Sequence, residues 1–152
     1  MNLSVYLGLL HKAEQTLADS FRQVAKGHGE EPDVHFLCQT LAKQCDEHQR
    51  ALQPLVDRYG ETPEAEPERL HAEGLSETRQ GPVGLLRDLQ DLYLLASLVD
   101  ITWGMVKQAG QALRDSEMLA VVDQCDKQTA VQLAWLQSRM RQAAPQALLV
   151  AE

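Results

Sequence analysis

Apolar residues recur along four stretches of the chain at alternating spacings of three and four positions, the period of one face of an α-helix. In residues 34–59 this stripe consists of Val34, Cys38, Leu41, Cys45, His48, Leu52, Leu55 and Tyr59. The same period marks residues 3–25, 83–113 and 117–143. The sequence therefore predicts an all-α chain of four helices.

The stretches between these four helices contain residues that end or interrupt helices. Glycines and a proline between residues 26 and 32 mark a short turn, and residues 114–117 form a second, tighter turn. Gly60 fits the C-terminal cap of the second helix. Residues 60–82 contain three prolines and an acidic first half, which favours a long connection.

The order of connections, short then long then short, predicts how the helices pack. Helices joined by a short turn pack antiparallel as a hairpin, and a long crossover carries the chain between two hairpins. The length of 152 residues suits one domain with a full core. We therefore expect residues 1–152 to form one four-helix bundle, in which residues 60–82 join two antiparallel hairpins.

The charge and the apolar runs argue against two classes of partner. The 14 Lys and Arg residues face 22 Asp and Glu residues, and the net charge of −8 opposes binding to nucleic acid. No apolar run is long enough to cross a membrane, and the N-terminus lacks a cleavable signal segment. Cys38 and Cys45 are about 10 Å apart along one helix, too far for a disulfide. We expect a cytoplasmic protein with reduced thiols.

Each predicted helix carries polar residues near the middle of its apolar stripe. They are Glu14 in the first, Cys45 and His48 in the second, Asp100 in the third, and Asp126 with Thr129 in the fourth. Counting outward from the first turn places Glu14 at the height of Cys45 and His48. The same count from the second turn places Asp126 about 6 Å along the helix from the height of Asp100. We expect these side chains to meet at one interior level.

With these positions the chain resembles the ferritin-like superfamily of carboxylate-bridged di-metal proteins. In that family the first and third helices each supply a Glu, and the second and fourth each supply a Glu-x-x-His segment. The matching positions here are Glu14, residues 45–48, Asp100 and residues 126–129. The resemblance implies a site for Fe, Zn or Mn whose ligands are Glu14, Cys45, His48, Asp100 and Asp126.

Several departures from the family pattern weaken this chemistry. Cys45 stands where a bridging Glu is expected, Thr129 stands where the second His is expected, and two Asp replace longer Glu. Two divalent ions about 4 Å apart need bridging carboxylates to offset their repulsion. We therefore expect a degenerate di-metal site in a non-catalytic scaffold or interaction protein. The alternative is a metal-binding protein or oxidoreductase with a mononuclear or unusual di-metal centre, in which Cys45 is a thiolate ligand or redox thiol.

The same residues also have simpler structural explanations. Glu14 can pair with a neighbour such as His11, and Cys45 can be a small buried apolar side chain. A charged His48 among Glu14 and the two aspartates gives a metal-free network. Whether the protein is an enzyme therefore stays open.

The two tryptophans and three of the other histidines are assigned to the core or to the surface by their positions. Trp103 fits the core, whereas Trp135 and Val131 lie off the stripe of the last helix and indicate a second apolar surface. Either a C2 homodimer or the crossover can cover such a surface, and we expect the homodimer. Three histidines lie in or beside loops and are expected at the surface: His28, His35 and His71.

Overall fold

The computed structural model describes residues 1–61, 74–75 and 77–151. It contains four long helices and a short π-helix: α1 (Leu3–Gly27), α2 (Pro32–Tyr59), α3 (Gly81–Leu113), α4 (Ser116–Pro145) and η1 (Gln146–Val150). The described residues include no strand. The predicted all-α class with four helices is therefore confirmed. Most of the expected crossover, residues 62–73 and 76, lies outside the described residues.

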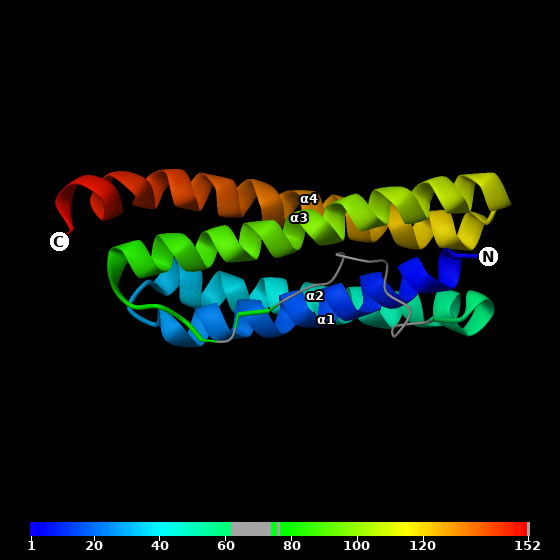
Figure 1. Ribbon diagram of the computed structural model, residues 1–152, viewed down its shortest axis with the longest axis horizontal. Helices are drawn as coiled ribbons and strands as arrows, with labels where there is room; N and C mark the ends of the chain where they lie inside the picture. Colours follow the sequence, from blue (N-terminus) through cyan, green and yellow to red (C-terminus); the bar gives the residue numbers. More distant parts are fainter. Residues whose placement is uncertain (62–73, 76, 152) are drawn as a thin grey trace.

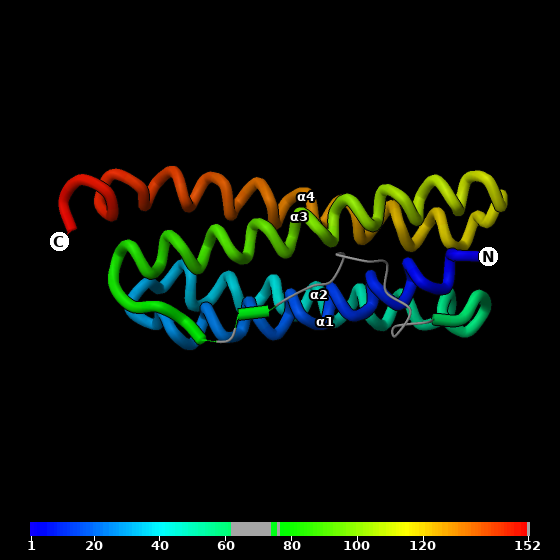
Figure 2. The backbone as a smooth tube through the Cα atoms, viewed as in Figure 1, coloured from blue at the N-terminus to red at the C-terminus, as the bar shows by residue number. Residues whose placement is uncertain are grey.

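The four helices form an elongated bundle (Figure 1). α1 packs mainly against α2, and α3 packs mainly against α4. α1 also packs against α3, and α2 approaches α4, whereas the described parts of α1 and α4, and of α2 and α3, do not approach closely. Figure 2 shows the chain reversing at the turns that follow α1 and α3, and the two termini lie at opposite ends of the bundle.

Backbone geometry explains where the helices end. Gly60 has a φ of 82°, a conformation that favours glycine, and its N–H donates to the Val56 carbonyl at 2.7 Å. Arg114 is in the left-handed conformation, with a φ of 53°, and ends α3. The Asp115 carboxylate then caps α4 by accepting from the Met118 N–H at 3.0 Å. Both helix ends agree with the turns expected from the sequence.

The apolar stripes of the four helices form one continuous core. Its largest fully buried side chains include Leu7, Leu10, Leu17, Phe21, Leu52, Leu55, Leu89, Leu92, Trp103 and Leu136. Burial of each large apolar side chain stabilises the fold by about 1.5–3 kcal/mol. Among the described residues, no helix is long and apolar enough to cross a membrane.

Ion pairs hold α2 and α4 together at both ends of the bundle. At one end Arg58 on α2 donates to the Asp115 carboxylate at 2.8 Å. At the other end Arg139 on α4 donates to the Asp33 carboxylate at 2.7 Å. The middle of this helix pair is also polar, because it contains the candidate site.

Candidate functional site: a buried polar network

Glu14 lies at the centre of a polar network inside the bundle. Its carboxylate is fully buried on α1, and Oε1 accepts hydrogen bonds from His48 Nδ1 at 3.0 Å and Trp103 Nε1 at 2.9 Å. A buried carboxylate is tolerated only when such donors replace water. His48 belongs to α2 and Trp103 to α3, so this single oxygen connects three helices.

His48 extends the network to the fourth helix. Its Nε2 lies 2.6 Å from Oε1 of Gln128 on α4, and the ring itself is buried. Oε1 of Glu14 and Oε1 of Gln128 are both acceptors, an arrangement that suits a ring with a hydrogen on each nitrogen. Burial lowers the pKa of His48, but the hydrogen bond and charge of Glu14, helped by Gln128, outweigh it and raise the pKa. The arrangement favours the imidazolium form.

Glu14, His48, Trp103 and Gln128 together form what we call the core network. Each residue comes from a different helix. The rings of His48 and Trp103 also meet edge to face, with centroids 6.3 Å apart and an interplanar angle of 87°. The core network therefore fixes the relative height of all four helices.

Cys45 lies one helical turn before His48 and borders the core network. Gln132 Nε2 donates to Gln44 Oε1 at 3.1 Å and approaches Cys45 Sγ at 3.8 Å. Burial, followed by the charge and nearby carboxylate of Glu14, raises the pKa of the Cys45 thiol. A thiolate ligand or redox thiol needs the opposite shift. The surroundings of Cys45 therefore favour a protonated, buried thiol.

Two buried oxygen atoms beside Cys45 accept no hydrogen bond from the described residues. They are Oε2 of Glu14 and Oε1 of Gln132. The thiol of Cys45 lies near the Glu14 carboxylate, but it does not complete a hydrogen bond of good geometry to Oε2. These two oxygens could therefore accept further hydrogen bonds at the site.

The two aspartates expected at the same level form a separate pair. Asp100 on α3 and Asp126 on α4 are both half-buried and face each other. Burial, together with the charge and hydrogen bonding of Asp126, raises the pKa of Asp100. Neither aspartate is hydrogen-bonded to Glu14 or His48 in the described structure. The structure thus joins Glu14 and His48 by a hydrogen bond with Cys45 beside them, whereas Asp100 and Asp126 interact with each other.

The side chains present do not fit a di-metal centre. Among the residues that the structure describes, no three His, Cys, Asp or Glu side chains are grouped to hold a metal ion. Both ring nitrogens of His48 point at acceptors, and one Glu14 oxygen already receives two donors. Two ions need several bridging carboxylates, and this network supplies one.

Trp103 and Gln128 belong to the core network but were not among the residues predicted for the site. Trp103 was expected in the core, but without a polar role. A buried indole N–H usually finds an acceptor, so a carboxylate partner was a foreseeable requirement. Gln128 lies inside the segment 126–129 and gave no signal, because it is off the expected apolar stripe.

His28 is buried rather than at the surface, so that expectation was wrong. Its relative exposure is 7%, and Nε2 lies 2.7 Å from Oδ2 of the fully buried Asp88. Arg79 donates to the same carboxylate through its backbone N–H at 3.0 Å and through Nη1 at 2.7 Å. This cluster fastens the start of α3 to the end of α1.

The remaining histidines lie away from the core network. His11 contacts the Glu61 carboxylate at 2.9 Å and is not the partner of Glu14. His35 is half-buried, and its Nδ1 donates to the Ala25 carbonyl at 2.7 Å. His71 lies outside the described residues.

Comparison with known proteins leaves the core network as the basis for assigning a function. No protein-family model, curated protein or solved structure matches this chain. The geometry of the buried residues therefore has to carry the functional conclusion.

Proposed function

We propose that this protein is a ferritin-like bundle whose interior metal layer is replaced by hydrogen bonds, and that it acts as a non-catalytic scaffold or interaction protein. The observation that carries this proposal is that Glu14 Oε1 accepts hydrogen bonds from both His48 and Trp103. The short, long and short connections, and the packing of α1 on α3, support the ferritin-like arrangement.

The core network has a structural consequence that suits a scaffold. A buried ion pair contributes little net stability, because desolvation offsets attraction, but breaking it is costly. Here the pair between Glu14 and His48 penalises any sliding of one helix against the others. The bundle can therefore present a surface of fixed shape to a partner.

The thiols of the protein also suit a non-catalytic role. All three cysteines, Cys38, Cys45 and Cys125, are free and buried. Burial, followed by a nearby carboxylate, raises the pKa values of Cys38 and Cys125 to about 12. Protonated thiols are poor nucleophiles and poor metal ligands at neutral pH. Free thiols also fit the reducing cytoplasm, where we place the protein.

Metal analysis tests this proposal against its main alternative. Protein without a polyhistidine tag is incubated with Fe(II), Zn(II) or Mn(II), desalted and analysed for metal, alongside His48→Ala and a His35→Ala control. We expect far less than one equivalent of metal in all three proteins. One equivalent in the wild type and the control, lost in His48→Ala, would contradict the proposal and favour a metal-binding protein or oxidoreductase.

A further inference from the structure

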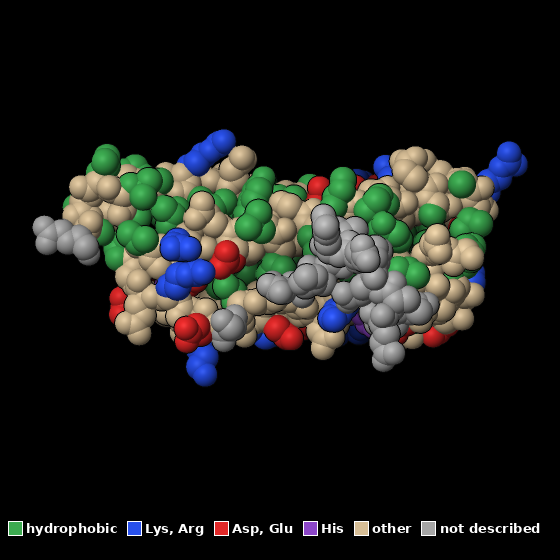
Figure 3. Space-filling model, viewed as in Figure 1, with side chains coloured by type: hydrophobic (Ala, Val, Ile, Leu, Met, Phe, Trp, Pro, Cys, Tyr) green, Lys and Arg blue, Asp and Glu red, His purple; other side chains and the backbone are tan. Residues whose placement is uncertain are grey.

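α3 carries a second apolar face that points away from the bundle core. Leu94, Ile101 and Met105 are exposed, at 67%, 60% and 42%, and Leu98 between them is half-buried. Their spacing of four, three and four positions places them on one side of the helix. We call these four residues the outer stripe. Figure 3 shows hydrophobic side chains at the surface along this region.

The outer stripe is free of charge on a strongly acidic protein. Asp100 is the only charged residue among residues 92–106, and it faces Asp126 on α4 instead. The whole chain carries a net charge of −8, and 24% of its residues are charged. Loss of charged residues at the centre of a patch is typical of protein interfaces.

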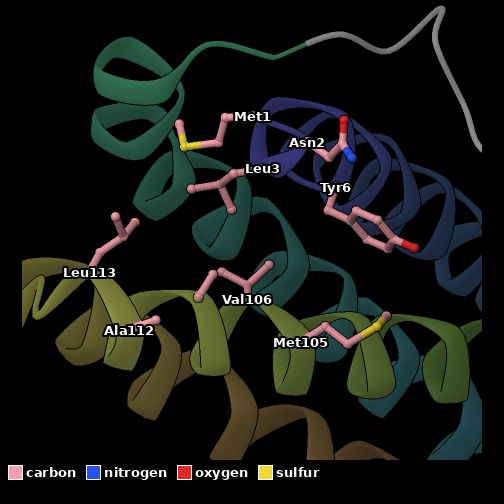
Figure 4. A pocket seen from close by; sticks show the side chains of 9 residues that line it. Met1, Asn2, Leu3, Tyr6, Met105, Val106, Ala112 and Leu113 are labelled. Atoms are coloured by element: carbon pink, nitrogen blue, oxygen red, sulfur yellow. The ribbon is translucent and has the colours of Figure 1, made fainter.

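An apolar cavity extends the outer stripe toward the end of α3. The cavity has a volume of about 450 Å³, and its walls include Leu3 and Tyr6 of α1 and Met105, Ala109 and Leu113 of α3. Figure 4 shows these two helices contributing side chains from both sides. Among the described residues that line it, none has a charged side chain. The apolar surface therefore continues from the middle of α3 to the start of α1.

The exposed side of α3 supplies more than half of the area that one partner of a typical dimer interface buries. Val83 and Leu113 are also exposed, and the strip of α3 between them is about 45 Å long and 10–12 Å wide, a footprint of about 500 Å². A stable interface buries about 800 Å² on each partner. The cavity rim on α1 supplies further apolar area. The centre of this strip, from Leu94 to Met105, is apolar, and Arg87 and Asp91 lie beyond it, as in interfaces with an apolar centre and a polar rim.

We propose that a second copy of this chain covers the outer stripe, with the two α3 helices packed antiparallel about a two-fold axis between Leu98 and Ile101. This inference rests on the proposed role as an interaction protein and names its partner. The axis sets Leu94 against the partner's Met105, and Leu98 against the partner's Ile101. An interface of this kind must be self-complementary, and a spacing of four, three and four reads the same in both directions.

The charges that flank the outer stripe permit this register. Arg87 falls opposite the partner's Ala112, and Asp91 falls opposite the partner's Gln108. No like charges meet on this face. The sequence had suggested Val131 and Trp135 on α4 as the second apolar surface, but Trp135 is half-buried and packs against the core. Val131 is 64% exposed without comparable neighbours on α4.

Sedimentation velocity of the full chain tests the interface. We expect a wild-type dimer of twice 17.0 kDa. In Leu98→Glu/Ile101→Glu the dissociation constant should rise at least 100-fold, with unchanged helical circular dichroism. Val131→Glu adds a charge at an equally exposed apolar site and should remain dimeric. A monomeric wild type at 100 µM, or equal dissociation of both variants, would overturn the proposal.

Cysteine cross-linking tests the register without depending on the charged variants. Leu94 and Met105 are about 16 Å apart along one helix, so a disulfide in Leu94→Cys/Met105→Cys can form only between chains. We expect efficient cross-linking of this variant under mild oxidation, and little in either single variant. Equal cross-linking of a single variant would contradict the register. A monomer would refute the interface alone, whereas bound metal would refute the proposed function alone.

Discussion

The buried pair between Glu14 and His48 makes the most demanding prediction. Glu14→Gln keeps the shape of the side chain but removes the charge that His48 faces at 3.0 Å. Breaking one partner of a buried ion pair costs about 3–5 kcal/mol. A domain of this size has a free energy of unfolding of about 5–15 kcal/mol. We therefore expect Glu14→Gln and His48→Gln each to lose a large part of the stability.

The double variant separates the pair from the individual side chains. If the two residues form one buried pair, Glu14→Gln/His48→Gln should lose less stability than the sum of the single losses, by about 2–3 kcal/mol. Urea denaturation followed by circular dichroism gives the free energies of unfolding. A double variant of two distant residues, Glu14→Gln/His35→Gln, should show additive losses.

The stabilising interaction between Glu14 and His48 should depend on pH, and the raised pKa of His48 gives the direction of that dependence. The pKa of His48 is raised above its ordinary value of 6.5. Its contribution to stability is therefore fully present below pH 6.5 and is lost as the pH rises through the raised pKa. The coupling should therefore be largest below pH 6.5 and should decrease as the pH rises through the raised pKa. Single losses below about 1 kcal/mol, additive in the double variant and independent of pH, would refute the buried pair.

Three further predictions concern other contacts. Trp103→Phe removes one donor to the Glu14 carboxylate and should lower the free energy of unfolding by about 1.5–3 kcal/mol; a loss below 0.5 kcal/mol in urea denaturation would contradict the contact. Asp88→Ala leaves buried donors unpaired and should cost about 2–4 kcal/mol, with amide exchange accelerating first at the start of α3; uniform acceleration would argue against this local role. The pKa of Asp115 is lowered to about 2, first by the hydroxyl of Tyr59 and then by the Met118 N–H, so its contribution is present above pH 3.8 and is lost as the pH falls through 2. Asp115→Asn should therefore remove part of the acid sensitivity in thermal unfolding, and an unchanged acid profile would be inconsistent with that shift.

The helices could be predicted because their signals are local. Each apolar stripe is read from neighbouring residues, and Gly60 and the turn at Arg114 mark helix ends by backbone conformation. Counting from the first turn also matched Glu14 to His48 correctly. A short turn fixes the register of its two helices, so distance along the chain translates into height in the bundle.

The buried face of α4 was predicted only in part. The period along residues 117–143 selects Leu119, Val122, Asp126, Thr129, Leu133, Leu136 and Met140. Val122, Thr129 and Leu136 are buried as expected, whereas the other four are half-buried, and Met118, Cys125, Gln132 and Arg139 are buried in addition. The hydrophobicity of Leu119 and Leu133 favoured positions at the edge of the buried face. Buried Gln132 and Arg139 are polar residues whose partners on α2 cannot be seen from α4 alone.

The same limit explains the pairing of the two aspartates and the burial of His28, neither of which the sequence predicted. Asp100 lies at the edge of the buried stripe, next to Val99, so it turns toward α4 and pairs with Asp126. His28 looked like a loop residue because its partner, Asp88, is 60 positions away in the sequence. Contacts between distant segments decide these positions, and no local pattern encodes them.

The protonation of His48 tests the central claim most directly. Nitrogen NMR of protein with labelled histidine, assigned with His48→Gln, reports whether each ring nitrogen carries a hydrogen. We predict that both nitrogens of His48 are protonated at pH 6 and that the ring titrates above 6.5. A ring with one unprotonated nitrogen at pH 6, or a titration below 6.5, would contradict a charged core network of Glu14, His48, Trp103 and Gln128.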